Sequence, residues 1–255
     1  MMAQVKILEG AEEFALGSGP VGALLVHGFT GSPQGMRGLG EFLAGKGIAV
    51  LAPRLPGHGT TWEDLNSRTA HEWIAEVENA FHRMAAERDE VFIVALSFGA
   101  TLALDFAARY PDEVAGLVTL AGMVMTKDPR RHLAPVIKRL TRSVPGVGND
   151  IADPTGKEIA YDRLPTGAAY YMLRFLKSAR LGLPAVRCPV LVMHGRQDHT
   201  VHPSNAQLIL DSVGSQDKEL VWLDRSYHVV TLDYDRDEVF ERTYEFIKGH
   251  SSHAL

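Results

Sequence analysis

Residues 91–101 of the chain read Val91-Phe92-Ile93-Val94-Ala95-Leu96-Ser97-Phe98-Gly99-Ala100-Thr101. An apolar, β-branched run of strand length ends at Ser97, and a helix-forming run over residues 102–109 follows it. The small residues Ala95 and Gly99 flank the serine, two positions before and two positions after it. A turn this sharp brings the helix hard against the strand and leaves little room for side chains at those positions. The pattern predicts a strand, a tight turn and a helix, with a hydroxyl at the apex.

The serine at this apex has the setting of a nucleophile. It stands at the N-terminus of the following helix, where developing negative charge is stabilised. The arrangement corresponds to a nucleophile elbow, usually written G-x-S-x-G, with Ala95 in place of the first glycine. Serines between small residues also occur in ordinary turns. The interpretation of Ser97 as a nucleophile therefore depends on a base and an acid elsewhere in the chain.

Segments of strand and helix character alternate along most of the sequence. Continuous apolar runs predict strands at residues 21–26, 48–52, 91–96, 114–120, 189–193 and 219–223. Apolar residues at helical spacing predict helices at about residues 36–43, 70–88, 102–109, 203–210 and 237–248. This alternation predicts an α/β fold, with a mostly parallel central sheet, right-handed crossovers and helices on both faces.

The alternation breaks between about Met125 and Pro184. Here a short helical pattern with one apolar face (Leu133, Val136, Ile137, Leu140) precedes a turn-rich connector and a second helix over about residues 168–181. Long insertions into compact domains are usually functional. We expect residues 1–124 and 184–255 to form the core, and residues 125–183 to form a small helical cap.

A base and an acid follow two later predicted strands. Asp198 comes just after the strand that ends at Met193, and His228 comes just after the strand that ends at Leu223. A serine nucleophile needs a histidine base, which a carboxylate orients, and the chain order Ser, Asp, His suits this kind of sheet. Reactive groups gather at the carboxyl ends of such strands. The sequence therefore predicts a triad of Ser97, His228 and Asp198.

Each member of this triad has a competing interpretation. Asp198 could simply cap a turn, and Asp224 is a rival acid, although it precedes His228 too closely to lie on a separate strand. Asp198 also lies among three histidines (His194, His199 and His202) that could be taken for a metal cluster. Their spacing is not that of a helical zinc motif, so the sequence does not favour a metal site.

Acyl transfer also requires donors for an oxyanion. The backbone N–H of Phe98, which follows the nucleophile, is one candidate. The loop His27-Gly28-Phe29-Thr30-Gly31 follows an earlier strand, and the N–H of Phe29 is the best candidate for the second donor. His27 and His58 lie in glycine-flanked loops and are expected to make structural hydrogen bonds.

Composition and charge narrow the class of protein. The 255 residues are 45% hydrophobic and 22% charged, which is typical of an ordinary soluble globular protein. The net charge of −5 is not the positive charge expected of a nucleic-acid-binding protein. No apolar run could span a bilayer, and the start, Met1 to Glu9, lacks the apolar stretch of a secretory signal. We expect a cytoplasmic location, with export of an already trimmed chain left open. The single cysteine, Cys188, is expected to be a small buried hydrophobe.

The combined motifs resemble those of one family. The loop 27–31, Pro56-Gly57-His58-Gly59, the serine elbow, His194-Gly195-x-x-Asp198 and the late His228 are similar to the bacterial carboxylesterase and monoacylglycerol lipase branch of the serine α/β-hydrolases. The resemblance covers nearly all of the chain except the cap. It implies the α/β-hydrolase fold, with the cap inserted after the sixth strand. It also implies hydrolysis of short- to medium-chain acyl esters, including monoglycerides, with no cofactor.

Other activities on the same fold stay open. Thioesterases, peptidases and C–C hydrolases share this triad, and some proteins of the fold are ligand receptors or regulators. A serine nucleophile argues against dehalogenases and epoxide hydrolases, which use an aspartate. The basic residues of the predicted cap, Lys127 to Arg142, also raise the hypothesis of a weak contact with anionic lipid surfaces, without membrane insertion.

Overall fold

A single mixed sheet forms the centre of the molecule. The computed structural model describes residues 5–146 and 149–255; residues 1–4 of the expected core and 147–148 of the expected cap lie outside this part. The sheet contains β1 (Phe14–Leu16), β2 (Val21–Val26), β3 (Ala49–Ala52), β4 (Glu90–Leu96), β5 (Gly116–Leu120), β8 (Val190–Gly195) and β9 (Lys218–Leu223). Their spatial order is β1-β3-β2-β4-β5-β8-β9. Only β1 runs antiparallel to its neighbour, so the predicted parallel sheet is confirmed.

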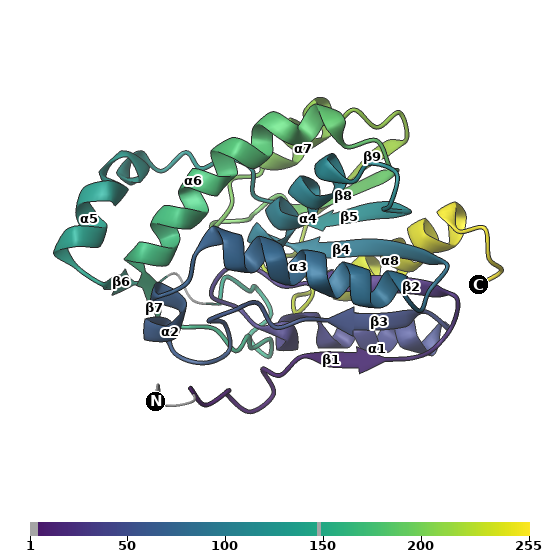
Figure 1. Cartoon of the computed structure of the whole chain (residues 1–255), viewed down its shortest axis with the longest axis horizontal. Helices are drawn as coiled ribbons and strands as arrows, with labels where there is room; N and C mark the ends of the chain where they lie inside the picture. Colours follow the sequence, from purple (N-terminus) through teal and green to yellow (C-terminus); the bar gives the residue numbers. More distant parts are fainter. Residues whose placement is uncertain (1–4, 147–148) are drawn as a thin grey trace.

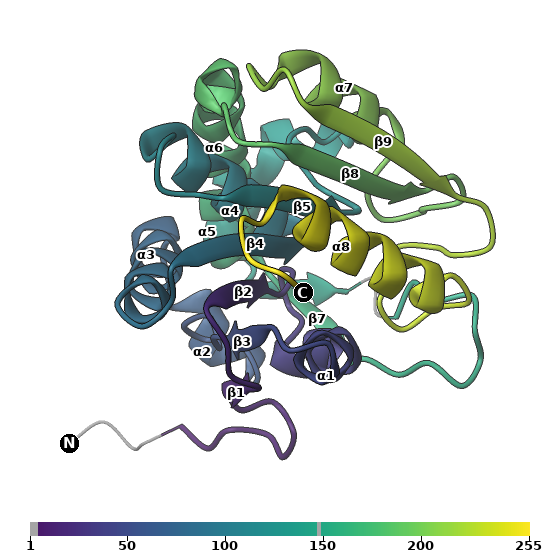
Figure 2. The ribbon, with the colours of Figure 1, turned by 90° about the vertical axis from the view of Figure 1, so that its right-hand side faces the viewer.

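Helices cover both faces of this sheet (Figures 1 and 2). One face carries α1 (Arg37–Gly45) and α8 (Arg236–His250). The other carries α3 (Ala70–Ala85), α4 (Phe98–Arg109) and α7 (Ser204–Ser212). The side chains of β4 alternate between two buried clusters: Val91, Ile93 and Ala95 join one, and Phe92, Val94 and Leu96 join the other. A strand covered on both faces needs apolar residues at every position, which explains the continuous apolar run before Ser97.

Residues 125–183 lie between β5 and β8 and contain short elements of both kinds. These are η2 (Pro129–Leu133), α5 (Ala134–Leu140), β6 (Ser143–Pro145), β7 (Arg163–Pro165) and α6 (Thr166–Gly182), followed by η3 (Leu183–Ala185). Five strands precede this segment in the described part of the chain, so its expected place after the sixth strand is wrong. Residues 5–13, the described part of the chain before β1, turn at Gly10 (φ 84°) and contribute no further strand to the sheet edge.

The two helices of this segment differ in how they pack. The buried side chains of α6 include Met172, Phe175 and Leu176, and this helix lies against α4. The apolar face predicted for α5 is instead open to water: Leu133, Val136 and Leu140 are 57%, 53% and 80% exposed. Helical spacing shows which side chains share a face, but it does not show whether anything covers that face.

Four small features were not predicted. They are β1 at the sheet edge, the helices η1 (Pro33–Met36) and α2 (Trp62–Asn66), and the two-stranded antiparallel sheet of β6 and β7. The segment 125–183 is tied to the core near α2, where the Tyr161 hydroxyl donates to Gly57 O and accepts from Thr60 N, and Asn66 accepts from Gly167 N. In the described residues, no helix is both long enough and apolar enough to cross a bilayer.

Candidate active site

Ser97 occupies a strained turn between β4 and α4. Its backbone has φ 56° and ψ −118°, a conformation that residues other than glycine rarely adopt. The Ser97 amide donates to the carbonyl of Leu120 on the neighbouring strand, over 2.8 Å. The Ser97 carbonyl accepts from the amides of Ala100 and Met123. These backbone bonds hold the serine at the helix N-terminus, as predicted from residues 91–101.

Close approach of two backbones explains the small residues around this turn. A Cβ atom added at Gly99 would lie 2.5 Å from the carbonyl oxygens of both Val26 and His27. A Cβ added at Gly28 would lie 3.1 Å from the Cβ of Ser97. Ala95 is fully buried and still permits the turn. Glycine is therefore required after the serine but not before it.

The structure brings the three predicted side chains together. His228 Nε2 lies 2.9 Å from Ser97 Oγ, and His228 Nδ1 lies 2.8 Å from Asp198 Oδ2. All three residues are less than 9% exposed. Each follows the carboxyl end of its strand, β4, β8 or β9. A carboxylate, an imidazole and a hydroxyl in this order can move a proton from the serine to the histidine.

Electrostatics favour a charged form of this histidine. Burial lowers the pKa of His228, but the hydrogen bond and negative charge of Asp198 outweigh it, so the pKa is raised above its usual value. Burial raises the pKa of Asp198, but hydrogen bonds from His194 and His228 reverse that effect and lower it well below the usual range. Asp198 therefore stays ionised and stabilises an imidazolium at His228.

The rival acid lies elsewhere. Asp224 accepts a hydrogen bond from Arg196 Nε at 2.9 Å, and its side chain is 75% exposed. Asp198 instead faces the interior, where its Oδ1 accepts from the backbone amides of Thr200 and Val201. These two bonds fix the carboxylate and leave Oδ2 for His228.

Buried carboxylates anchor the loop that carries His228. Asp233 is fully buried, and its two oxygens accept from four backbone amides: Ala152, Asp153, Tyr227 and Tyr234. The carbonyl of Asp150 accepts from the amides of His228 and Val229. The segment after β6 and the histidine loop are thereby held to each other. These anchors were not predicted, because an aspartate in a loop has no distinctive sequence pattern.

The side chains of the two residues predicted to supply oxyanion donors contact each other. The rings of Phe29 and Phe98 are 5.8 Å apart and nearly perpendicular. Phe98 is the first residue of α4, where the N–H has no partner within the helix. Hydrogen bonds in the described part of the chain include none donated by the Phe29 amide. Both N–H groups are therefore free to donate a hydrogen bond to an oxyanion. Their part in catalysis stays a prediction.

His27 joins this loop to the next one. Burial lowers the pKa of His27 to about 4, so the ring is neutral near pH 7. Its Nδ1 donates to Gly28 O, and its Nε2 accepts from the Leu55 amide at 3.1 Å. The predicted structural role of His27 is thus seen, except that one ring nitrogen accepts. His58 packs edge-on against both His27 and Phe29.

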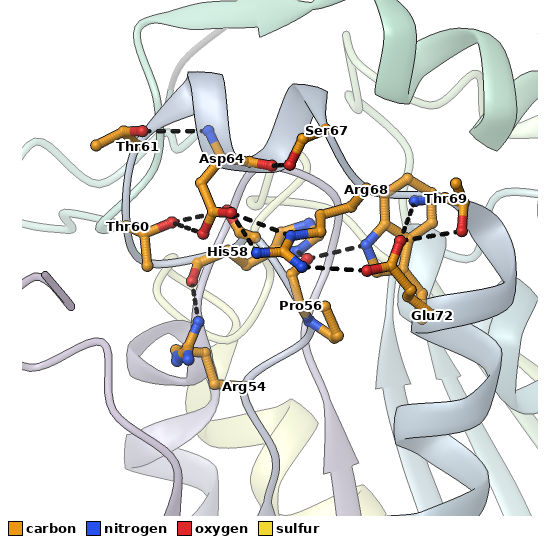
Figure 3. Close-up of polar contacts among 12 residues, drawn as sticks. Arg54, Pro56, His58, Thr60, Thr61, Asp64, Ser67, Arg68, Thr69 and Glu72 are labelled. Atoms are coloured by element: carbon orange, nitrogen blue, oxygen red, sulfur yellow. Dashed lines mark hydrogen bonds and ion pairs between the residues drawn. The ribbon is translucent and has the colours of Figure 1, made fainter. Parts of the chain in front are cut away.

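The loop after β3 is braced by its own polar network (Figure 3). Arg68 bonds Asp64 and Glu72, one turn before and one turn after it. Arg54 Nη1 donates to the carbonyl of His58 at 2.8 Å. Thr60 donates to Asp64. This network fixes the loop against which the Phe29 loop packs.

Two further side chains reach the site. His194 Nε2 lies 3.2 Å from Asp198 Oδ2. Glu158, from the segment before β7, lies against the Phe29 loop: a Cβ added at Gly31 would be 2.5 Å from Glu158 Oε1. Burial raises the pKa of Glu158 to about 7, and the charge of His228 opposes this. Nothing in the sequence distinguished Glu158 from other loop carboxylates.

The site offers no set of metal ligands. Within residues 5–146 and 149–255, no group of three or more histidine, cysteine or carboxylate side chains is arranged to hold an ion. His199 bonds Asp150 through Nδ1, and His202 lies beside Lys127, so the histidines near Asp198 point to different partners.

The sequence is similar to a family of serine hydrolases and to known esterases. A family model described as Hydrolase_4, serine aminopeptidase S33, matches residues 22–235. The chain is 39% identical to a thermostable monoacylglycerol lipase of Bacillus sp. (strain H-257) over 253 residues, which span 98% of this chain and 100% of that protein. It is 27% identical to a carboxylesterase of Bacillus subtilis (strain 168), over 92% of this chain and 95% of the relative.

Solved structures agree with this. A structure from work on two metagenome-derived lipolytic enzymes, LipS and LipT, matches with a TM-score of 0.93 and 37% identity, over 96% of this chain and 100% of that chain. The monoacylglycerol lipase of Paleococcus ferrophilus matches with a TM-score of 0.79 over 94% and 98% of the two chains. At 20% identity, this second likeness concerns the fold alone. The α/β-hydrolase fold is confirmed.

The close contact at Gly99 yields a test. Gly99→Ala places a methyl group against two carbonyl oxygens and must displace Ser97 from the Phe29 loop. We expect labelling of Ser97 by a fluorophosphonate to slow by about a hundredfold, since small misplacements cost that much. Gly45→Ala is the matched control, because a Cβ there meets nothing within 4 Å. Equal labelling rates in the two variants would contradict this account of the turn.

Proposed function

We propose that this chain, which belongs to the serine aminopeptidase S33 family of α/β-hydrolases, hydrolyses monoacylglycerols and related esters of short- to medium-chain acids. The chain is a serine ester hydrolase. The observation that carries the proposal is the buried contact of Ser97, His228 and Asp198 in a chain 39% identical, over its whole length, to a monoacylglycerol lipase.

In the proposed mechanism, Ser97 attacks the ester carbonyl while His228 Nε2 takes its proton. The imidazolium is stabilised by Asp198, and the amides of Phe29 and Phe98 donate to the oxyanion. His228 then protonates the leaving alcohol and leaves an acyl group on Ser97. Water, deprotonated by His228, attacks this acyl-enzyme and releases the acid. No cofactor takes part in these steps.

Three substitutions test the assignment of the triad. Ser97→Ala removes the nucleophile and should abolish turnover of p-nitrophenyl butyrate. Asp198→Asn should lower kcat by about 10⁴-fold, because the histidine loses its orienting charge. Asp224→Asn is the control and should behave as the wild type, since that side chain is 75% exposed. Circular dichroism checks folding. Full activity in Asp198→Asn would refute the role given to this acid.

Glu158 supports the choice of a polyol ester. Its carboxyl lies against Gly31 in the Phe29 loop and is close enough to His228 for that charge to lower its pKa. A carboxylate accepts hydrogen bonds from two hydroxyl groups, which glycerol offers and a simple alcohol does not. We assign to Glu158 the binding of the glycerol hydroxyls.

This assignment predicts a pH effect. Because the pKa of Glu158 is raised to about 7, the group is protonated below that pH and a carboxylate above it. The carboxylate is the better acceptor, so KM for a monoacylglycerol should fall as pH rises through about 7. In Glu158→Gln this dependence should vanish, with KM for p-nitrophenyl butyrate unchanged. Steady-state kinetics from pH 6 to 8 measure it, and a dependence that survives in Glu158→Gln would overturn the assignment.

We further assign residues 125–183 as a cap over the site, and α5 as its contact with lipid. The exposed Val136 and Leu140 lie on the same short helix as Lys138 and Arg139, and the exposed Leu133 is the N-cap of that helix. Apolar residues beside basic ones suit the surface of an anionic bilayer, which attracts each basic residue by about 1 kcal/mol.

Vesicle binding tests this contact. The protein should sediment weakly with phosphatidylglycerol vesicles and not with phosphatidylcholine vesicles. Leu140→Asp should abolish sedimentation, because it places a negative charge in the apolar face. Leu181→Asp is the control. This side chain is 75% exposed, but it lies near the C-terminal end of α6 and outside the apolar face of α5. Sedimentation that does not depend on anionic lipid, or that survives Leu140→Asp, would exclude α5 as the contact.

A further inference from the structure

A second imidazole contacts the acid of the triad. His194, near the end of β8, is fully buried. Its Nε2 lies 3.2 Å from Asp198 Oδ2, the same oxygen that accepts from His228 Nδ1 at 2.8 Å. With the amides of Thr200 and Val201 on Oδ1, this carboxylate has four donor groups around it.

The proton of His194 can be placed from its neighbours. Nε2 also lies 3.0 Å from the carbonyl oxygen of Val201, which can only accept. Nε2 therefore carries a hydrogen, which it donates to Val201 O while lying 3.2 Å from Asp198 Oδ2. The bond to this backbone carbonyl thus holds the Nε2–H beside the Asp198 carboxylate.

The other nitrogen argues against a purely structural role. Nδ1 of His194 is buried, and among the described residues it has no hydrogen-bond partner. An unpaired buried polar atom destabilises the fold, and a leucine would occupy similar space without it. What His194 supplies and leucine does not is the Nε2–H that lies against both Val201 O and Asp198 Oδ2.

We propose that His194 is a positioning residue, which holds the Asp198 carboxylate toward His228 and withdraws part of its negative charge. The proposal rests on the proposed function, because it acts through the same triad. Asp198 Oδ2 faces two donors, so its charge is divided between them. Without His194, that charge is directed to His228 alone, and the imidazolium becomes easier to form.

The lowered pKa of Asp198 agrees with this, since burial alone would raise it and the hydrogen bond from His194 opposes burial. Two other charged groups, Glu158 and Asp150, also raise the pKa of His228. Neither contacts His194 through a hydrogen bond or an ion pair in the described residues, so substitution at His194 leaves both in place. A change in the titration of His228 then reports on Asp198.

The test compares two substitutions. His194→Leu removes the donor, whereas His194→Gln keeps an N–H near the position of Nε2. The acid limb of kcat/KM for p-nitrophenyl butyrate reports the pKa of His228, which must be neutral to act as base. In His194→Leu this limb should move to higher pH by about half to one unit, with kcat about tenfold lower and KM little changed. In His194→Gln it should stay near the wild-type position.

A purely structural role would instead lower the melting temperature and leave the limb where it is, and that result overturns the proposal. An equal shift in both variants also overturns it. If His194→Leu does not fold, His194→Met removes the donor with a more adaptable side chain. The proton resonance of His228 Nδ1–H gives a readout without turnover: it should move downfield in the donor-free variant only. If the wild type hydrolyses no ester, the proposed function fails, while this resonance still decides the role of His194.

Discussion

The structure depends on a backbone turn that is strained at one residue. Ser97 is held at φ 56° because β4 must end and α4 must begin within a single residue. The strain persists because the surroundings over-determine it: the Ser97 amide bonds β5, and Gly99 packs directly on the backbone after β2. This turn places the Ser97 hydroxyl at the carboxyl end of β4, next to the N-terminus of α4. The positions of the base, the acid and the oxyanion donors are useful only because that hydroxyl is fixed.

The groups that meet Ser97 come from loops, which lack the regular backbone hydrogen bonds that make helices and strands rigid. Here the loops are held instead by carboxylates that accept from backbone amides. Asp198 is fixed by two amides, and Asp233 by four, which tie the His228 loop to the segment after β6. On the opposite side, His27 and the network around Arg68 hold the Phe29 loop. Preorganised donors and acceptors of this kind need not rearrange when charge develops on the substrate.

Much of this could be predicted from the sequence, because it depends on local patterns. The buried strand before Ser97, the small residues beside it and the strand-terminal places of Asp198 and His228 all lie within short stretches. Non-local features were not predicted. The outward face of α5 depends on what α6 leaves uncovered, and the number of strands before the insertion depends on which segments pair at the sheet edge. The contacts of His194 and Glu158 arise from distant segments meeting, which no spacing in the sequence reveals.

The central claim is that the acyl group of the ester passes through a covalent bond to the Ser97 oxygen. The most direct measurement is mass spectrometry of protein quenched with acid during turnover of a p-nitrophenyl ester, followed by peptide mapping. The account predicts an added acyl mass on the peptide that contains Ser97, and its accumulation when Asp198 or His228 is altered so that deacylation slows more than acylation. Rapid release of the acid with no acyl mass on Ser97, or with the mass on another side chain, would contradict the account.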